Sequence, residues 1–144
     1  AYGIPVVAEV IAPDAQAARH AAEQLGFPVV VKLVSRDVSH KSDVGGVALG
    51  LRNVDEVVQA IDKITQNVQL LRPEAVIDGF SVQPMVQRPG AYELLLGMST
   101  DRQFGPVLMF GEGGVAVEVI GDTSLGLPPL NRTLAMEMIS ATRV

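Results

Sequence analysis

The first half of the chain alternates apolar runs of strand length with apolar residues at helical spacing. The run at residues 29–34 is almost continuously apolar, which is typical of a strand buried on both faces of a sheet. Asp14 precedes a stretch of alanines at helical spacing and Gly26 follows it, so they predict the N-cap and the end of a helix. The elements predicted in order are a strand over residues 4–11, a helix from Asp14 to Gly26, strands over 29–34 and 47–51, a helix from Asn53 to Leu71 and a strand over 80–86.

The second half is richer in predicted strands and has a single predicted helix. The order of elements lacks strict strand–helix–strand alternation, so the pattern indicates a mixed α/β or α+β fold. The chain begins in a structured stretch and ends at Val144 within a helical pattern, and we therefore expect it to be an excised piece of a longer protein. The predicted elements are strands over 92–98, 107–110 and 115–120 and a helix from near Asn131 or Thr133.

A change of character marks the expected seam between two parts of the chain. Helix-rich sequence gives way to strand-rich sequence near residues 83–90, where Gln87-Arg88-Pro89-Gly90 forms a predicted turn. We assign residues 1–82 to a first subdomain, and residues 83–144 to a hinge and a second subdomain.

Composition narrows the class of protein. The chain is 48% hydrophobic and 19% charged, which is enough apolar material for a core. Its net charge is -5 and no basic stripe is present, so a nucleic-acid partner is disfavoured. No apolar run reaches the roughly 20 residues that span a bilayer, so no membrane partner is expected. Cysteine is absent, which fits a reducing cytoplasm.

Lys32 is the first candidate for chemistry. A lysine inside VVVKLV is costly to bury unless its ammonium group finds a partner. Either the strand lies at a sheet edge and the side chain reaches water, or the strand fixes the lysine so that it points at an anionic ligand. The flanking apolar residues disfavour an edge strand, so we favour an anion-binding lysine.

The polar stretch VSHKSDVGGV follows this strand directly. Gly45 and Gly46 allow a sharp turn and close approach of a ligand, and their exposed N–H groups can face phosphate oxygens. Lys41 adds a positive charge, and His40 can serve as acid, base, ligand or nucleophile. The alternative is a solvated surface loop, but its position after Lys32 favours a functional one.

A second glycine turn, Gly111-Glu112-Gly113-Gly114, is followed by the carboxylates Glu118 and Asp122. The turn is either a simple hairpin or part of a phosphate site, and the carboxylates are either magnesium ligands or surface charges. The chain contains no P-loop and no complete dinucleotide-binding fingerprint. His20 lies in the alanine-rich helix and is expected to face solvent.

Six segments, taken in order, resemble one known family over nearly the whole chain. It is the ATP-grasp domain of the NDP-forming acyl-CoA synthetases, which also occurs fused to GNAT protein-lysine acetyltransferases. HKSDVGGV and FGP…GEGG are the most specific matches. The segments are GFPVVVK (26–32), SHKSDVGGV (39–47), VQPMV (82–86), Glu93 to Gly97, FGP (104–106) with Gly111 to Gly114, and LPPL (127–130).

The resemblance implies an α+β ATP-grasp fold of two subdomains that hold ATP between them, truncated here at the C-terminus. Glutamine at position 83 replaces the glutamate that is common in such hinges. The implied nucleotide-binding residues are Lys32, Lys41, Gly45, Gly46 and Val47 near the phosphates, Gln83, Met85 and Val86 at the adenine hinge, Glu93 in the cleft, and Gly113, Gly114 and Glu118 near the phosphates or metal.

The resemblance also implies the reaction. The family interconverts ATP, a carboxylate and CoA with acyl-CoA, ADP and phosphate, through an acyl phosphate and a phosphohistidine. His40 matches a histidine thought to relay the phosphoryl group to the nucleotide, which makes it the implied catalytic residue. The cofactors would be ATP/ADP and Mg²⁺, with the main metal ligands beyond Val144. The partners would be the CoA-binding ligase subdomains, or a GNAT domain if the chain is a regulatory module, and the fragment alone should not turn over.

Overall fold

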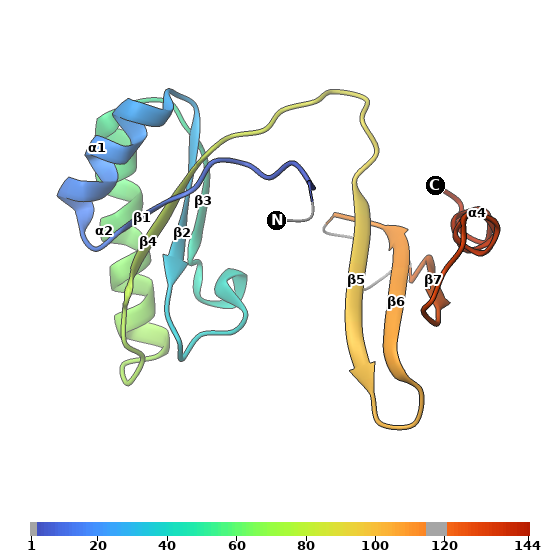
Figure 1. The fold of residues 1–144 in the computed structure, drawn as a ribbon. Coiled ribbons are helices and arrows are strands. Elements are labelled where there is room, and N and C mark those ends of the chain that lie inside the picture. Colours follow the sequence, from blue (N-terminus) through green and yellow to red (C-terminus); the bar gives the residue numbers. More distant parts are fainter. Residues whose placement is uncertain (1–2, 115–120) are drawn as a thin grey trace. The chain divides into compact units, whose positions relative to one another are not determined.

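The structure is a computed structural model that describes residues 3–114 and 121–144. The chain divides into two compact units, Ala1–Gln87 and Arg88–Val144. Each unit has its own antiparallel sheet (Figure 1). Gln83 and Pro84 lie in the last strand of the first unit, and the assignment of a hinge from residue 83 onwards stays a prediction.

The first unit is a four-stranded sheet with both of its helices packed into one core. The strand order is β1-β4-β2-β3, so β2 lies between two neighbours. The elements of the unit are β1 (Val10–Ala12), α1 (Ala15–Leu25), β2 (Val29–Val34), the 3₁₀ turn η1 (Lys41–Val44), β3 (Val47–Leu51), α2 (Val54–Leu71) and β4 (Gly79–Pro84).

Side-chain caps fix where the helices begin, as the sequence predicts. The Asp14 carboxylate accepts the N–H of Ala17 at 2.8 Å, and the Asn53 side chain accepts the N–H of Glu56 at 2.9 Å. Glu56 in turn accepts the N–H of Arg52 at 2.7 Å, close to the reciprocal arrangement of a capping box. These bonds satisfy N–H groups that have no partner within the helix.

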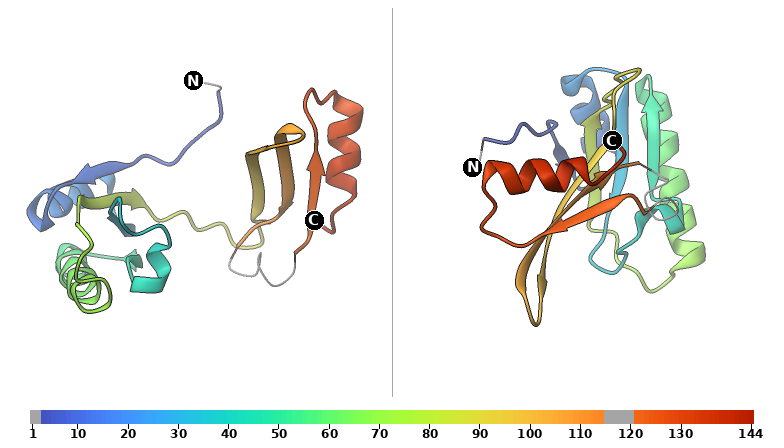
Figure 2. Two further views of the ribbon diagram at one scale, coloured as in Figure 1. Left: turned by 90° about the horizontal axis from the view of Figure 1, so that it is seen from below. Right: turned by 90° about the vertical axis from the view of Figure 1, so that its right-hand side faces the viewer.

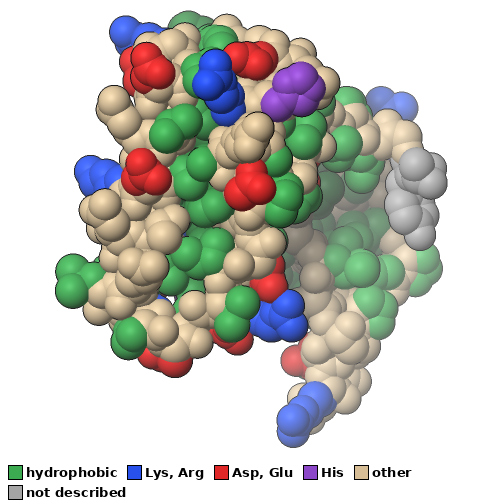
Figure 3. All heavy atoms as spheres, turned by 90° about the vertical axis from the view of Figure 1, so that its left-hand side faces the viewer, with side chains coloured by type: hydrophobic (Ala, Val, Ile, Leu, Met, Phe, Trp, Pro, Cys, Tyr) green, Lys and Arg blue, Asp and Glu red, His purple; other side chains and the backbone are tan. Residues whose placement is uncertain are grey.

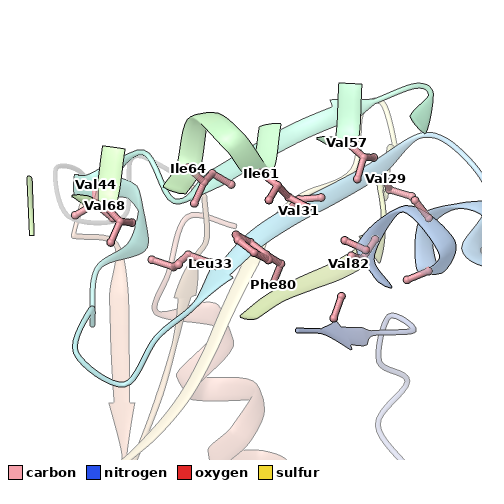
Figure 4. Packing of buried hydrophobic residues seen from close by; sticks show 14 of the residues in the cluster. Val29, Val31, Leu33, Val44, Val57, Ile61, Ile64, Val68, Phe80 and Val82 are labelled. Carbon is pink, nitrogen blue, oxygen red and sulfur yellow. The ribbon is translucent and has the colours of Figure 1, made fainter. Parts of the chain in front are cut away.

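The core of the first unit lies between one face of the sheet and the helices. Side chains alternate between the two faces of a strand, and Val29, Val31 and Leu33 of β2 all point to the core and are fully buried. Helix α2 covers them with Val57, Ile61, Ile64 and Val68 (Figure 4). Full burial of each such side chain contributes about 1.5–3 kcal/mol, so this face is well determined. The opposite face of β2 carries Val30, Lys32 and Val34.

The second unit is a three-stranded sheet in the order β5-β6-β7 with one described helix beside it (Figure 2). Gly126 of β7 faces this helix closely, since a Cβ atom there would lie 2.9 Å from the sulfur of Met138. The elements are β5 (Leu94–Asp101), β6 (Gly105–Glu112), β7 (Thr123–Gly126) and α4 (Arg132–Ser140).

Several predicted boundaries are wrong. The first strand begins at Val10 rather than at residue 4, because β4 pairs only with Val10–Ala12. The second helix ends at Leu71 as predicted, and Leu71 in its last turn is 54% exposed. Strand β7 was not predicted, and α4 ends at Ser140 instead of continuing to the end of the chain. The strand predicted at residues 115–120 lies outside the described residues.

The outer face of α1 and α2 carries both acidic and basic side chains, interspersed with apolar and uncharged polar groups (Figure 3). Of the helices in the described part of the chain, none combines the length and the apolar character needed to cross a bilayer.

Candidate functional site

Lys32 lies on the face of the first sheet that points away from the core. Strand β2 is paired with β4 on one side and β3 on the other (Figure 1), so the explanation of Lys32 as an edge-strand lysine is wrong. The side chain is half-buried rather than free in water. Lys32 is therefore held by an inner strand, as an anion-binding lysine would need to be.

A chain of polar side chains surrounds the Lys32 ammonium group. Lys32 Nζ donates to Gln83 Oε1 at 3.0 Å, and Gln83 Nε2 donates to Glu9 Oε1 at 2.8 Å. The Ser81 hydroxyl donates to the same Glu9 oxygen at 2.5 Å. Ser81 lies directly opposite Lys32 in the β2–β4 register. Strands β4 and β2, together with the residue just before β1, thus bring these side chains into one network.

The Glu9 carboxylate is stabilised in its charged form. Hydrogen bonds from Ser81 and then from Gln83 lower its pKa below the ordinary value, although desolvation acts in the other direction. The positive charges of Lys32 and Lys41 lower this pKa further. Glu9 therefore carries a negative charge on the face that also carries the Lys32 ammonium group.

The segment that carries His40 is anchored at both ends. At its start, the N–H and guanidinium group of Arg36 bind the Asp78 carboxylate, and Asp37 accepts the N–H of Val76 at 2.9 Å. At its end, the carbonyl of Gly46 accepts the N–H of Leu33 at 2.7 Å. Between these two anchors, the side chains in the middle of the loop are available to contact a ligand.

His40 lies at the start of η1 and is exposed, with no capping hydrogen bond from its ring. It lines a pocket of about 230 Å³ together with Asp43 and Arg72. Its ring is therefore accessible to a group approaching from solvent, as a nucleophile or phosphoryl acceptor would require. The other histidine, His20, is also exposed, as predicted, and lies 3.0 Å from the Gln24 amide nitrogen on α1.

The glycine pair makes a sharp turn but does not offer free N–H groups in this conformation. Gly45 has φ +61°, and its N–H donates to Ser42 O at 3.0 Å. The N–H of Gly46 donates to Lys41 O at 2.7 Å. The expectation that both amides are exposed to a ligand is therefore wrong for this state, because η1 uses them to close its own turn.

The predicted hinge begins inside β4, at Gln83, and continues past the end of this strand. The N–H of Met85 donates to Pro28 O at 2.8 Å, which holds this segment against the start of β2. Val86 is 54% exposed. Val47 of β3 is paired with Lys32, so it flanks the network on the other side. The predicted residues of the first unit, apart from those of the His40 loop, thus lie on or beside β2.

In the second unit, the structure brings Glu93 together with Gly113 and Gly114. The N–H of Gly113 donates to the carbonyl of Glu93 at 2.6 Å. A Cβ atom on Gly113 would lie 2.9 Å from the Glu93 carbonyl carbon, and one on Gly114 would lie 3.1 Å from Glu93 Oε2. Both glycines therefore make room for Glu93. Glu118, the remaining predicted residue here, lies outside the described residues.

The part of the chain that the structure describes has no group of side chains that would fit a resident metal ion. Across residues 3–114 and 121–144, no three His, Asp or Glu side chains gather as metal ligands. Asp122, considered as a metal ligand, instead accepts the N–H of Arg143 at 2.8 Å.

Sequence reasoning missed Glu9 and Ser81. Glu9 is a lone acidic residue within an apolar stretch, as Lys32 is a lone basic one, and such a pair of opposite charges is a usable signal. What the pattern could not show is that β1 and β2 both pair with β4, which brings the two charges to one face.

The fold agrees with comparisons to known proteins. Residues 1–144 match a family described as ATP-grasp domain, and the chain belongs to that family. The predicted ATP-grasp fold is thereby confirmed.

Among curated proteins, the chain is 49% identical over 139 residues to an ADP-forming acetate–CoA ligase I of Archaeoglobus fulgidus. The match covers 96% of this chain and 20% of that protein. The predicted resemblance to ADP-forming acyl-CoA synthetases is confirmed, whereas the alternative of a GNAT fusion receives no support from these relatives.

Two solved structures of acetyl-coenzyme A synthetase 1 from Candidatus Korarchaeum cryptofilum resemble the chain. The first, in complex with coenzyme A, Ca-AMPCP and HgCl⁺, has a TM-score of 0.90 and 44% identity, covering 99% of this chain and 61% of that one. The second, with coenzyme A and Mg-AMPPCP, has a phosphohistidine segment pointing towards the nucleotide-binding site. Its TM-score is 0.72 at 39% identity, over 99% of this chain and 58% of that one. The chain thus spans less than two thirds of each relative.

Proposed function

We propose that this chain is the nucleotide-binding part of an NDP-forming acyl-CoA synthetase. The complete protein would convert ATP, a carboxylate and CoA into acyl-CoA, ADP and phosphate. The observation that carries the proposal is the Lys32 ammonium group, which an inner strand holds 3.0 Å from Gln83 at the end of β4. A fixed cation next to a predicted adenine hinge fits a nucleotide, which carries a base at one end and phosphates at the other.

The nucleotide would bind to groups from both predicted subdomains. The first comprises residues 1–82, and residues 83–144 comprise the hinge and the incomplete second subdomain. In the first, Lys32, Lys41 and Val47 would lie near the phosphates, and in the hinge Gln83, Met85 and Val86 would lie near the base. In the second, Glu93 would line the cleft with Gly113, Gly114 and Glu118. The contact of Glu93 with the two glycines supports a shared role for them.

The loop of Gly45 and Gly46 would have to change shape if its amides are to bind phosphate oxygens. Both N–H groups are used within η1, so η1 must open before they can donate to a ligand. A 3₁₀ turn has less favourable hydrogen-bond geometry than an α-helix, which keeps the cost of opening modest. Lys41, which precedes the pair, can contribute its charge without such a change.

We assign to His40 the relay of the phosphoryl group. An unprotonated ring nitrogen of His40 would attack the phosphorus of a phosphohistidine brought by another part of the enzyme. In this ATP-forming direction, the bond from phosphorus to the first histidine breaks as the bond to His40 forms, and a β-phosphate oxygen of ADP then displaces His40 to give ATP. In the direction that forms acyl-CoA and ADP, the same two transfers run in reverse. The exposure of His40 supports this role, because the donor must approach from outside the chain.

The partners follow from this scheme. The CoA-binding and ligase subdomains of the same enzyme would supply the first histidine and the acyl group. Mg²⁺ would accompany the nucleotide, as it does in one related structure, with its main ligands outside this chain. We place the reaction in the cytoplasm, which the absence of cysteine fits.

The test is ADP formation by the complete protein from ATP, with carboxylate and CoA supplied together and singly. We expect ADP only when both are present, little or none with His40→Ala, and normal turnover with the matched control His20→Ala. Turnover that survives in His40→Ala would show the relay role to be wrong while leaving the ligase function intact. An inactive wild-type protein would instead favour a regulatory ATP-grasp module.

A further inference from the structure

We infer that Glu9 is a positioning residue that sets the place of the Lys32 ammonium group by fixing the orientation of the Gln83 side-chain amide. The inference rests on the proposed function, since it deepens the description of the same nucleotide site. Glu9 lies just before β1, outside every segment that the sequence analysis connects with the nucleotide.

The donor and acceptor chemistry allows one orientation of the Gln83 amide. A lysine ammonium group can only donate, and a carboxylate can only accept. Gln83 lies between them and must therefore turn Oε1 towards Lys32 and Nε2 towards Glu9, as the contacts at 3.0 and 2.8 Å require. Without Glu9, the Lys32 ammonium group alone would hold the amide in this orientation, and Gln83 Nε2 would lose its acceptor in the network.

Glu9 is itself held in place by β4. The Ser81 side chain is only 3% exposed, and its hydroxyl donates to the Glu9 oxygen that also accepts from Gln83. A buried hydroxyl without a partner is unfavourable, so this bond ties the carboxylate to the strand. Because Ser81 is also paired with Lys32 across the sheet, the network closes around a rigid strand pair.

The charge balance fits a phosphate ligand. The Glu9 carboxylate bonds Gln83 and Ser81 directly, and it faces the positive charges of Lys32 and Lys41. Lys41 adds a second positive charge that acts on Glu9, so the Glu9 carboxylate is outnumbered by the two lysines that influence it. Glu9 therefore acts on Lys32 through the neutral Gln83 amide, and the ammonium group stays available to the nucleotide.

Two substitutions of Glu9 separate hydrogen bonding from charge. In Glu9→Gln, an amide oxygen takes the place of Oε1 and can accept from both Ser81 and Gln83, so the network persists without the charge. In Glu9→Ala, both bonds are lost. Glu74→Ala removes an exposed glutamate of the same unit and is the matched control.

The experiment follows two signals of the full chain by NMR. One is the side-chain amide resonance of Gln83, and the other is the change in the spectrum on titration with ADP, which gives the affinity. We expect Glu9→Ala to move the Gln83 resonance to the position of a free amide. We also expect it to weaken ADP binding about three- to tenfold, because a hydrogen bond of the network is lost. Glu9→Gln and Glu74→Ala should both resemble the wild type.

Three results would overturn the inference. Glu9→Ala could leave the Gln83 resonance and the affinity unchanged, or it could move the resonance without changing the affinity, which would make Glu9 structural only. Glu9→Gln could also fail to restore binding, which would show that charge and not amide orientation matters. A wild-type chain that does not bind ADP would instead contradict the proposed function itself, and so the two failures are distinguishable.

Discussion

Nζ of Lys32 lies 3.0 Å from Oε1 of Gln83, a residue 51 positions further along the chain. The antiparallel pairing of β2 with β4 brings them together, with Val30 opposite Gln83 and Lys32 opposite Ser81. A strand lysine and a predicted hinge residue, which come from separate segments that resemble the ATP-grasp family, therefore meet on one face of one sheet. The core occupies the other face, so the position of this pair depends on which face of the sheet is buried.

Leu33→Ala tests that assignment of faces. Leu33 is fully buried beside α2, and its truncation should lower the free energy of unfolding by about 2–5 kcal/mol through lost burial and a residual cavity. Leu49 lies on the neighbouring strand and is 62% exposed, so Leu49→Ala should change stability by less than about 0.5 kcal/mol. Urea unfolding followed by circular dichroism measures both. Equal losses would mean that the faces are assigned wrongly.

Gly113→Ala tests the contact between Glu93 and the second glycine turn. A Cβ atom at Gly113 would lie 2.9 Å from backbone atoms of Glu93, which cannot move aside easily. We expect a loss of about 1–3 kcal/mol in the stability of the second unit, as for other overpacked sites. Gly97→Ala is the control, because its Cβ would meet Met109 at an ordinary 3.9 Å. If the two variants unfold at the same urea concentration, the close approach of Glu93 is incorrect.

The strong helices and the inner strands could be predicted because their signals are local. Asp14 and Asn53 act as caps where the sequence places them, and the apolar spacing of α2 matches its buried side. Strand β7 was missed because its four residues have no clear alternation and depend on pairing with β6. The strand predicted from residue 4 is shorter in the structure, because only Val10–Ala12 pair with β4. The sequence pattern does not show where this pairing begins.

The candidate site was predictable in part, for a similar reason. Lys32 stands out as a charge within an apolar strand, and the family motifs point to Gln83. Glu9 escaped notice because its contacts, to Ser81 and Gln83, join residues 72 and 74 positions apart. The hydrogen bonds of Gly45 and Gly46 within η1 were also not foreseen, since a glycine pair by itself does not say where its N–H groups point.

The ion pair at the start of the His40 loop predicts how stability depends on pH. The hydrogen bond from the Arg36 guanidinium group, with the Arg36 N–H and charge, lowers the pKa of Asp78 below its ordinary value of 3.8. Because the folded pKa is the lower one, this contribution is present above the ordinary value and is lost as the pH falls through the folded value. Unfolding curves measured from pH 3 to pH 7 should give wild type a higher free energy of unfolding than Asp78→Asn at neutral pH. This difference in free energy should narrow below about pH 4.

Glu9 and Asp101 also have lowered pKa values, Asp101 through the N–H groups of Phe104 and Gln103. Both carboxylates are present in wild type and in Asp78→Asn, so their effects cancel in the difference. A gap between the two proteins that is the same at every pH would show that the Arg36–Asp78 pair does not contribute in this way.

The most direct test of the nucleotide-binding account is a titration of the full chain with ADP, comparing wild type with Lys32→Ala and with Lys63→Ala. Lys63 is an exposed lysine on α2 and has the same change in net charge when replaced. A hydrogen bond to a charged group contributes about 1.5–3 kcal/mol, so Lys32→Ala should weaken binding by roughly 10- to 100-fold, whereas Lys63→Ala should bind like the wild type. Equal affinities for all three proteins, or no binding by the wild type, would contradict the account.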